Sequence, residues 1–154
     1  MIGYMFDTNI FNAVLDQDIE LGERKDAIYY YTHIPLDEIQ QTSNEARREQ
    51  LERTFHAIGG ESVPTTSAIL DVSKWDQCSF DSGDGFLEKI RTELRALDRA
   101  CGKRLSETNQ SRDALVAHTC ISNGFFLVTN DKNLRAVSEN NGGKVLSMDE
   151  FLGT

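Results

Sequence analysis

The stretch Phe125-Phe126-Leu127-Val128-Thr129, followed by Asn130-Asp131, decides the fold of this chain. An apolar run of this kind predicts a strand that is buried on both faces, because a strand with one wet face alternates apolar and polar residues. Helices predicted over residues 111–122 and 133–139 flank this strand, and residues 144–147 predict a last strand. Strands that alternate with helices are typical of a parallel sheet covered by helices.

The same alternation runs through the rest of the chain. Further strands are predicted over residues 2–6 and 27–32, and helices over residues 10–15, from residue 34, over 44–57 and over 86–101. Residues 61–85 give only a weak pattern, with a short strand or helix over 65–72. On the 86–101 helix, one face is predicted to be apolar: Phe86, Ile90, Leu94, Leu97 and Cys101. The sequence therefore predicts a single domain over residues 1–154, an α/β three-layer α/β/α sandwich with a central, mostly parallel sheet.

Composition narrows the class of protein. The chain has 154 residues with a formal net charge of −9, which argues against a small basic protein that coats nucleic acid without specificity. Its three cysteines are widely spaced and form neither a zinc-binding motif nor a disulfide framework. No secretory signal and no apolar stretch long enough for a membrane span are found, so we expect a cytoplasmic protein with no membrane partner.

Four acidic residues follow, or lead into, the predicted strands. Asp7 comes directly after the first strand, Glu38 lies about a turn beyond the second, and Asp131 follows the strand that ends at Thr129. Asp113 is predicted in the first turn of the helix that leads into this same strand. Because the carboxyl ends of parallel strands form one edge of a sheet, we expect at least three of these acids to collect there.

A cluster of carboxylates favours metal chemistry. The acids repel one another unless cations or protons neutralise them, and oxygen ligands suit Mg²⁺ or Mn²⁺. Such a site supports metal-assisted hydrolysis at phosphorus. Each acid also has a structural explanation: Asp7 and Asp131 as helix N-caps, Asp113 as a first-turn acid favoured by the helix dipole, and Glu38 as one exposed glutamate among many.

The arrangement of motifs resembles the PIN-domain nucleases. Asp7-Thr8-Asn9 is similar to their opening DTN motif, and residues 34–39 to their second motif, in which a Glu follows a strand. Residues 112–117 and 124–131 resemble the third and fourth motifs, the last ending in Thr129-Asn130-Asp131. The resemblance runs from the first strand to residue 147 in the expected order and is weak between about residues 60 and 105.

This resemblance implies that Asp7, Glu38, Asp113 and Asp131 bind Mg²⁺ or Mn²⁺ and carry out catalysis, with RNA as the substrate. Asn9 and Thr129 are then supporting polar groups. Asp37 adjoins Glu38, which leaves the second ligand open by one position, and Asn133 stands where many relatives have a further acid. A resemblance to the VapC type of toxin implies an antitoxin protein as partner, for which the region around Trp75 and Phe80 is a candidate surface, and a homodimer.

A second group of residues is basic. Arg91, Arg95 and Arg99 recur at four-residue spacing, with Arg112 further on, and residues 86–112 hold seven basic and four acidic side chains. These arginines are candidates for contacts with RNA phosphates. A solvated helix face is the alternative, because interleaved acids can pair with them.

Other functions remain as alternatives. A haloacid-dehalogenase-like phosphatase needs a second Asp two residues after the first-strand aspartate, where this chain has Asn9, and a phospho-receiver domain needs paired acids ahead of Asp7. The alternative that is not an enzyme is a catalytically inactive PIN-fold binding or scaffold module. The presence of all four acids counts against it.

Overall fold

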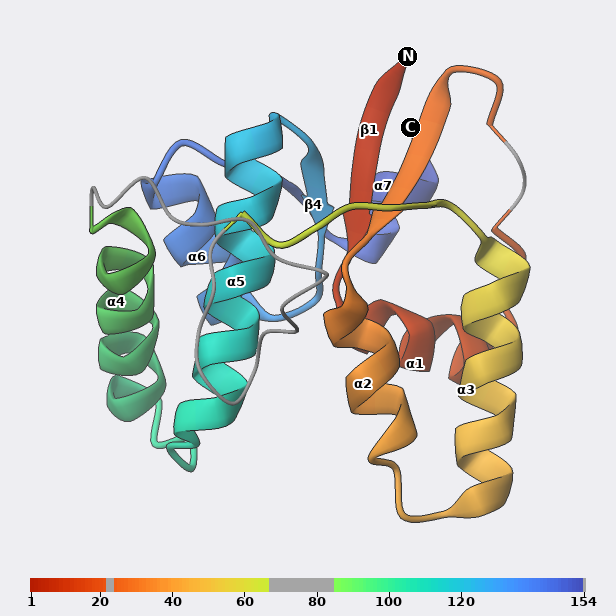
Figure 1. The fold of residues 1–154 in the computed structure, drawn as a ribbon, viewed down its shortest axis with the longest axis horizontal. Helices are drawn as coiled ribbons and strands as arrows, with labels where there is room; N and C mark the ends of the chain where they lie inside the picture. Colours follow the sequence, from red (N-terminus) through yellow and green to blue (C-terminus); the bar gives the residue numbers. More distant parts are fainter. Residues whose placement is uncertain (22–23, 67–84, 154) are drawn as a thin grey trace.

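A computed structural model describes residues 1–21, 24–66 and 85–153 of the chain. Within these residues a five-stranded parallel sheet has the strand order β3-β2-β1-β4-β5 (Figure 1). The strands are β1 (Ile2–Phe6), β2 (Ala27–Tyr31), β3 (Glu61–Ser62), β4 (Phe126–Val128) and β5 (Lys144–Leu146). The helices are α1 (Thr8–Gln17), α2 (His33–Gln40), α3 (Glu45–Ile58), α4 (Phe86–Ala100), α5 (Glu107–Asn123), α6 (Lys132–Asn140) and α7 (Met148–Gly153).

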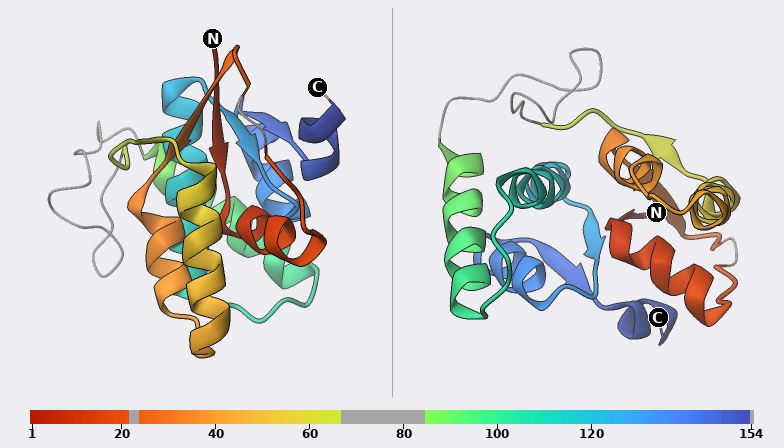
Figure 2. Two further views of the ribbon diagram at one scale, coloured as in Figure 1. Left: turned by 90° about the vertical axis from the view of Figure 1, so that its right-hand side faces the viewer. Right: turned by 90° about the horizontal axis from the view of Figure 1, so that it is seen from below.

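Helices cover both faces of the sheet and create two cores. Successive strand residues point to opposite faces, so Met5 and Leu127 pack with α4, α5 and α6, whereas Phe6 and Val128 pack with α1, α3 and α7 (Figure 2). All four strand residues are at most 2% exposed. Burial on both faces explains why the central strands are continuous apolar runs, and it confirms the predicted three-layer α/β fold class.

Strand register brings the first motif of the chain next to the last. Met5 pairs with Leu127 and Phe6 with Val128 in the parallel ladder between β1 and β4. Asp7 and Thr129 therefore leave the sheet side by side, and the backbone N–H of Asp7 donates to the carbonyl of Val128 at 3.1 Å. In Figure 1 the carboxyl ends of β1 and β2 face the region between α2 and α5.

Helix α5 begins earlier than the sequence predicts. The hydroxyl of Ser106 caps it by accepting from the backbone N–H of Asn109, so its first turn starts at Glu107. The prediction overlooked this cap and began the helix at residue 111. Asp113 therefore lies inside the helix, and the explanation of Asp113 as a first-turn acid favoured by the helix dipole is wrong.

Two further predictions need correction. The buried side of α4 is formed by Leu87, Ile90, Leu94 and Asp98, whereas Phe86 and Leu97 are only partly buried and Cys101 ends the helix exposed. The apolar pattern does not predict an aspartate on the buried side of this helix, and Asp98 is accommodated there by hydrogen bonds from Gln110 and Asn133. Neither the two-residue edge strand β3 nor the short helix α7 has a sequence pattern long enough to predict. Most of the predicted element over 65–72 lies outside the described residues.

No helix in the described part of the chain is long and apolar enough to cross a membrane.

Candidate active site

Asp7 is the most tightly held of the four predicted acids. Its carboxylate caps α1 by accepting from the backbone N–H of Thr8 at 2.7 Å. The other oxygen accepts from the Nδ2 amide of Asn9 at 2.5 Å and from the hydroxyl of Thr129 at 2.9 Å. Burial raises the pKa of Asp7 to about 6, although the hydrogen bond from Thr129 opposes this; repulsion from Glu38 and Asp131 adds to it. The carboxylate is fixed in place but costs free energy to ionise.

Asn9 and Thr129 are hydrogen-bonded to the Asp7 carboxylate and to each other. The Thr129 hydroxyl is buried and accepts from the Asn9 amide at 3.2 Å and from the backbone N–H of Asp131 at 3.0 Å. The amide oxygen of Asn9 accepts from the backbone N–H of Asn130 at 3.3 Å. Together they tie the loop after β4 to the start of α1.

Asp131 is both a helix cap and a member of the cluster. Its Oδ1 accepts from the backbone N–H groups of Asn133 and Leu134 at 2.8 and 3.0 Å, which caps α6. Its Oδ2 accepts from the Lys103 ammonium group at 2.8 Å. Burial opposes ionisation of Asp131, but the hydrogen bonds from Lys103 and from α6 prevail and lower its pKa. The structural interpretation of Asp131 as a helix cap is thus confirmed, and its second oxygen is left for other partners.

Glu38 reaches the cluster from α2. Its carboxylate accepts from the hydroxyl of Thr8, and one oxygen lies 4.0 Å from the Arg112 guanidinium. Burial raises the pKa of Glu38, while Thr8 and Arg112 oppose that effect. The neighbouring Asp37 instead lies 3.9 Å from the imidazole of His33. Glu38 rather than Asp37 is thus the residue of the second motif that contacts the cluster.

Asp113 lies where the repulsion is strongest. Its pKa is raised well above the ordinary aspartate value, first by burial and then by repulsion from Asp7, Glu38 and Asp131, with a further contribution from Asp98 on α4. The structure thus brings all four predicted acids within electrostatic reach of one another, from β1, α2, α5 and the end of β4. Carboxyl groups that cannot all ionise without a counter-charge are a mark of functional sites.

The donor set fits a hard divalent cation, since every candidate ligand is a carboxylate oxygen. Within residues 1–21, 24–66 and 85–153, however, no group of three or more His, Cys, Asp or Glu side chains stands in an arrangement that could hold a metal ion. Two of the four acids are bound by donors of the protein itself: the Thr8 hydroxyl donates to Glu38, and the Lys103 ammonium group donates to Asp131.

Sequence reasoning missed Lys103 and Asp98. The sequence indicates only that Lys103 is one of the basic residues of the stretch 86–112 and that Asp98 is one of its acids. Asp98 is 8% exposed and accepts from the side-chain amides of Gln110 at 3.1 Å and Asn133 at 2.7 Å. The position where many relatives carry an acid thus holds an amide that binds an acid from another helix. No sequence pattern links residues so far apart.

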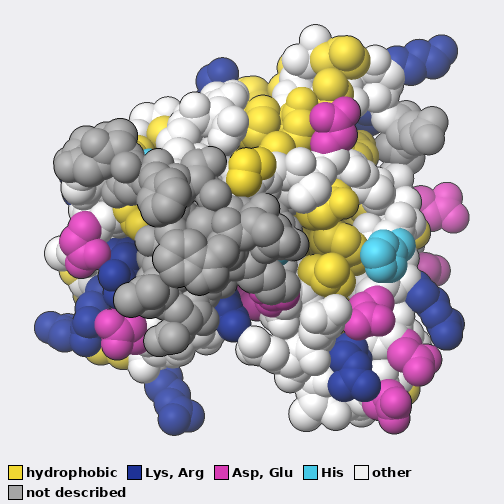
Figure 3. Space-filling view, viewed as in Figure 1, with side chains coloured by type: hydrophobic (Ala, Val, Ile, Leu, Met, Phe, Trp, Pro, Cys, Tyr) yellow, Lys and Arg dark blue, Asp and Glu magenta, His cyan; other side chains and the backbone are white. Residues whose placement is uncertain are grey.

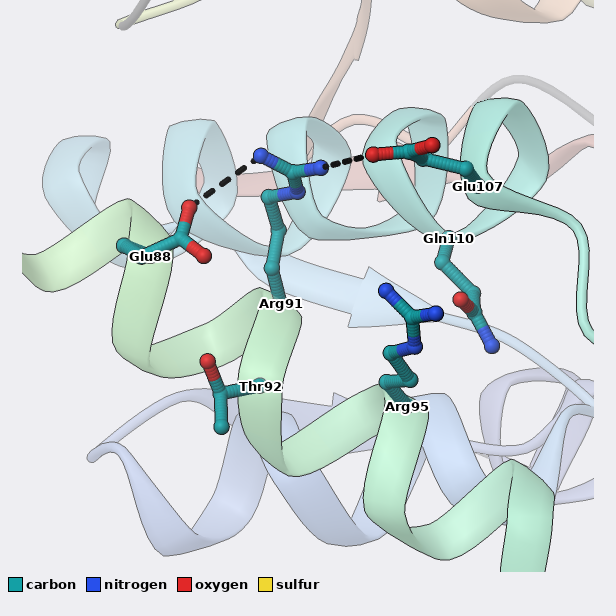
Figure 4. Close-up of a pocket in the computed structure, with 6 residues that line it drawn as sticks. All are labelled: Glu88, Arg91, Thr92, Arg95, Glu107 and Gln110. Carbon is teal, nitrogen blue, oxygen red and sulfur yellow. Dashed lines mark hydrogen bonds and ion pairs between the residues drawn. The ribbon is translucent and has the colours of Figure 1, made fainter.

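The predicted RNA-binding arginines do not form one continuous basic surface. Arg91 pairs with Glu88 at 3.1 Å and with Glu107 at 3.5 Å, bridging α4 and α5 beside the exposed Arg95 (Figure 4). Arg99 is exposed. Arg112 donates to the side-chain oxygen of Gln41 at 3.2 Å, in addition to its approach to Glu38. Acidic and basic side chains interleave along this side of the molecule (Figure 3), which matches the solvated-face alternative for Arg91.

The described cysteines, Cys101 and Cys120, are free. Burial raises the pKa of the Cys120 thiol to about 12, so this group is an inert core residue. His118 is buried against the ring of Phe86 at 5.1 Å, which fits a structural role. The candidate antitoxin surface around Trp75 and Phe80 lies outside the described residues.

Comparisons with known proteins support the fold. None of the family models compared with the chain matches it, and no curated protein matches its sequence. Among solved structures, VapBC2 from Rickettsia felis, bound to a DNA fragment from the promoter, has a TM-score of 0.54 at 14% identity and covers 95% of this chain and 98% of its own. VapBC-5 from Mycobacterium tuberculosis, of the VapBC family of toxin–antitoxin systems, and DNA-bound VapBC from Salmonella typhimurium each have a TM-score of 0.49 at 18% identity and cover 96% of this chain and 98% of their own.

The Rickettsia felis likeness shows that the chain has the α/β fold of a VapBC structure. This is the PIN-like fold that the motifs predict.

Proposed function

We propose that this protein is a ribonuclease that depends on Mg²⁺ or Mn²⁺ and hydrolyses phosphodiester bonds of RNA. The observation that carries the proposal is the convergence of Asp7, Glu38, Asp113 and Asp131 at the carboxyl edge of the sheet, with the pKa values of the first three raised. Helix caps account for Asp7 and Asp131, but capping explains neither Glu38 nor Asp113, and it does not explain why the four acids lie together. Four acids that repel one another in one place call for a cation.

In this proposal the four carboxylates hold the metal, which when bound supplies an activated water and stabilises charge that develops on phosphate oxygens. The protein's own part is positioning. Thr129 and Asn9 hold the carboxylate of Asp7 through hydrogen bonds of 2.9 and 2.5 Å, and α6 holds Asp131 through two backbone N–H groups. These hydrogen bonds fix the orientation of the Asp7 and Asp131 carboxylates.

RNA as the substrate, and an antitoxin protein as the partner, are further parts of the proposal. They are supported by the motif resemblance and by the fold shared with a VapBC structure. The net charge of −9 fits an enzyme that contacts RNA locally through a metal and a few cations rather than one that coats it. A homodimer and a cytoplasmic location stay predictions from the sequence. An inactive scaffold is disfavoured, because such a module has no use for four mutually repelling acids.

Cleavage of labelled single-stranded RNA in the presence of Mn²⁺ tests the proposal. The key variant is Asp113→Asn, which removes one ligand and keeps the side chain's size. Its matched control is Asp26→Asn, which removes the same charge from an exposed residue just ahead of β2, at the opposite edge of the sheet. We expect cleavage by the wild type and by Asp26→Asn, and nearly none by Asp113→Asn or after addition of EDTA. Cleavage that survives in folded Asp113→Asn would refute the assignment.

A further inference from the structure

A lysine of the protein occupies the oxygen of Asp131 that does not cap α6. The two carboxylate oxygens of Asp131 have different partners: Oδ1 is used by the backbone of α6, and Oδ2 is bound by the Lys103 ammonium group at 2.8 Å. Because capping of α6 uses Oδ1, Oδ2 is the oxygen available to a cation. Lys103 would therefore compete with a divalent cation for this oxygen.

The backbone directs Lys103 to this place. Helix α4 ends in a Schellman motif: Gly102, in the left-handed conformation with a φ of 68°, donates to the carbonyl of Arg99 at 3.1 Å, and the N–H of Lys103 donates to the carbonyl of Asp98 at 2.9 Å. This turn folds the chain back over the last turn of α4. The ammonium group of Lys103 consequently lies 3.7 Å from the buried carboxylate of Asp98 as well.

The backbone of Lys103 is held by the turn after α4, while its side chain is accessible to solvent. Its side chain is 47% exposed, so solvent and solutes can approach it, while that of Asp131 is 27% exposed. The other cation at the cluster, Arg112, is already hydrogen-bonded to Gln41 and lies beside Glu38. Of Lys103 and Arg112, Lys103 is thus the cation that can leave its carboxylate at the smaller cost in free energy, because Asp98 also lies beside its ammonium group. A flexible ammonium group is a suitable point charge for a phosphate.

We propose that Lys103 binds a phosphate group of the RNA substrate, and that its ammonium group moves to that phosphate from Asp131 when a divalent cation takes the carboxylate. This inference rests on the proposed function. An RNA strand that approaches four carboxylates meets repulsion, and a cation carried by the protein at the rim of the cluster offsets part of it. The same lysine competes with the metal when RNA is absent.

The proposal predicts effects of opposite sign on the two ligands. In Lys103→Met, Mn²⁺ no longer has to displace an ammonium group, so calorimetric titration with Mn²⁺ alone should show an affinity about two- to fivefold higher than that of the wild type, the size expected for loss of a partly exposed ion pair. Lys89→Met is the control, because Lys89 is an exposed lysine of α4, the helix that precedes Lys103, and pairs with Glu93 at 3.8 Å. Its affinity for Mn²⁺ should equal that of the wild type.

Binding of RNA should change in the other direction. We would measure anisotropy of a fluorescent oligouridine with Ca²⁺ in place of Mn²⁺, after checking on a gel that the RNA stays intact. Lys103→Met should bind it about three- to tenfold more weakly, and the slope of log affinity against log salt should fall by about 0.7, the value for one phosphate contact on a single strand. Lys103→Arg keeps the charge and should keep the slope, and Lys89→Met should match the wild type.

If Lys103 had only a structural role, Lys103→Met would not raise the affinity for Mn²⁺ and lower the affinity for RNA. The proposal for Lys103 would be overturned by an unchanged Mn²⁺ affinity in folded Lys103→Met, or by an unchanged salt slope for RNA binding. In either case, binding of Mn²⁺ and RNA by the wild type would leave the ribonuclease assignment standing. Absence of Mn²⁺ and RNA binding in the wild type itself would overturn the proposed function, and the role of Lys103 with it.

Discussion

Replacing Asp7 by Asn should stabilise the metal-free protein at neutral pH. The carboxyl group is 6% exposed and has a pKa of about 6 in the folded chain, against 3.8 as its ordinary value. The folded chain therefore holds this proton more tightly than the unfolded chain does. The protonated carboxyl group of Asp7 therefore stabilises the folded wild type fully below about pH 3.8, and this stabilisation is lost as the pH rises through about 6. A difference of about two pH units corresponds to about 3 kcal/mol at neutral pH.

The asparagine variant avoids this cost and keeps most of the contacts. Asn caps a helix as well as Asp does, and its NH2 group can donate to the Thr129 hydroxyl, but it cannot accept from the Asn9 amide, so we subtract about 1 kcal/mol for the lost hydrogen bond. Asp7→Asn should thus raise the free energy of unfolding by about 2 kcal/mol near pH 7.5. Between about pH 5 and pH 7.5 the advantage over the wild type should grow by about 1 kcal/mol.

Urea unfolding in EDTA at the two pH values measures this effect. Asp26→Asn, in which an exposed acid at the other edge of the sheet is changed, should alter the free energy of unfolding by less than about 0.5 kcal/mol. If Asp7→Asn is destabilised at pH 7.5, or if its advantage does not change with pH, then burial and neighbouring acids do not oppose ionisation of Asp7 as described.

Three further predictions concern the supports of the site and its surroundings. Thr129→Val removes the buried hydroxyl that donates to Asp7 and should cost about 1–3 kcal/mol in urea unfolding, whereas Thr129→Ser should cost clearly less; equal losses would argue against the hydrogen bond. Gly143→Ala places a Cβ 2.8 Å from a backbone carbonyl oxygen of α6 and should lower the melting temperature by a few degrees, and an unchanged melting temperature would contradict this clash. Arg95→Met should weaken RNA binding more than Arg91→Met, because Arg91 is already paired with two glutamates; the reverse order in the anisotropy assay would favour Arg91 as the RNA contact.

The sequence was most informative where chemistry and fold use the same residues. The apolar run that ends at Thr129 could form only a buried strand, and the carboxyl-edge rule then placed Asp7 and Asp131 together. The motif resemblance singles out Asn9 and Thr129 as supporting polar groups, but it does not predict their hydrogen-bond partners. Both caps assigned to Asp7 and Asp131 as structural explanations exist as well, since one carboxylate can cap a helix and still face a cluster.

The misses have physical causes. A strand of two residues has too few side chains to show a period, so β3 left no pattern. The start of α5 depended on a serine cap several residues ahead of the predicted start, and Asp113 was misplaced within the helix as a result. The contacts of Lys103 with Asp98 and Asp131 arise from the turn after α4 and from helix packing, and neither leaves a periodic signal in the sequence.

Calorimetric titration with Mn²⁺ tests most directly whether the four carboxylates form one site for a divalent cation. We expect the wild type and Asp26→Asn to bind Mn²⁺ with equal affinity. Single changes of Asp7, Asp113 or Asp131 to Asn, or of Glu38 to Gln, should each weaken binding at least about tenfold. Binding should also weaken as the pH falls below about 6, because Asp7 then takes up a proton. Equal Mn²⁺ affinity in the wild type and in all four folded variants would contradict the account.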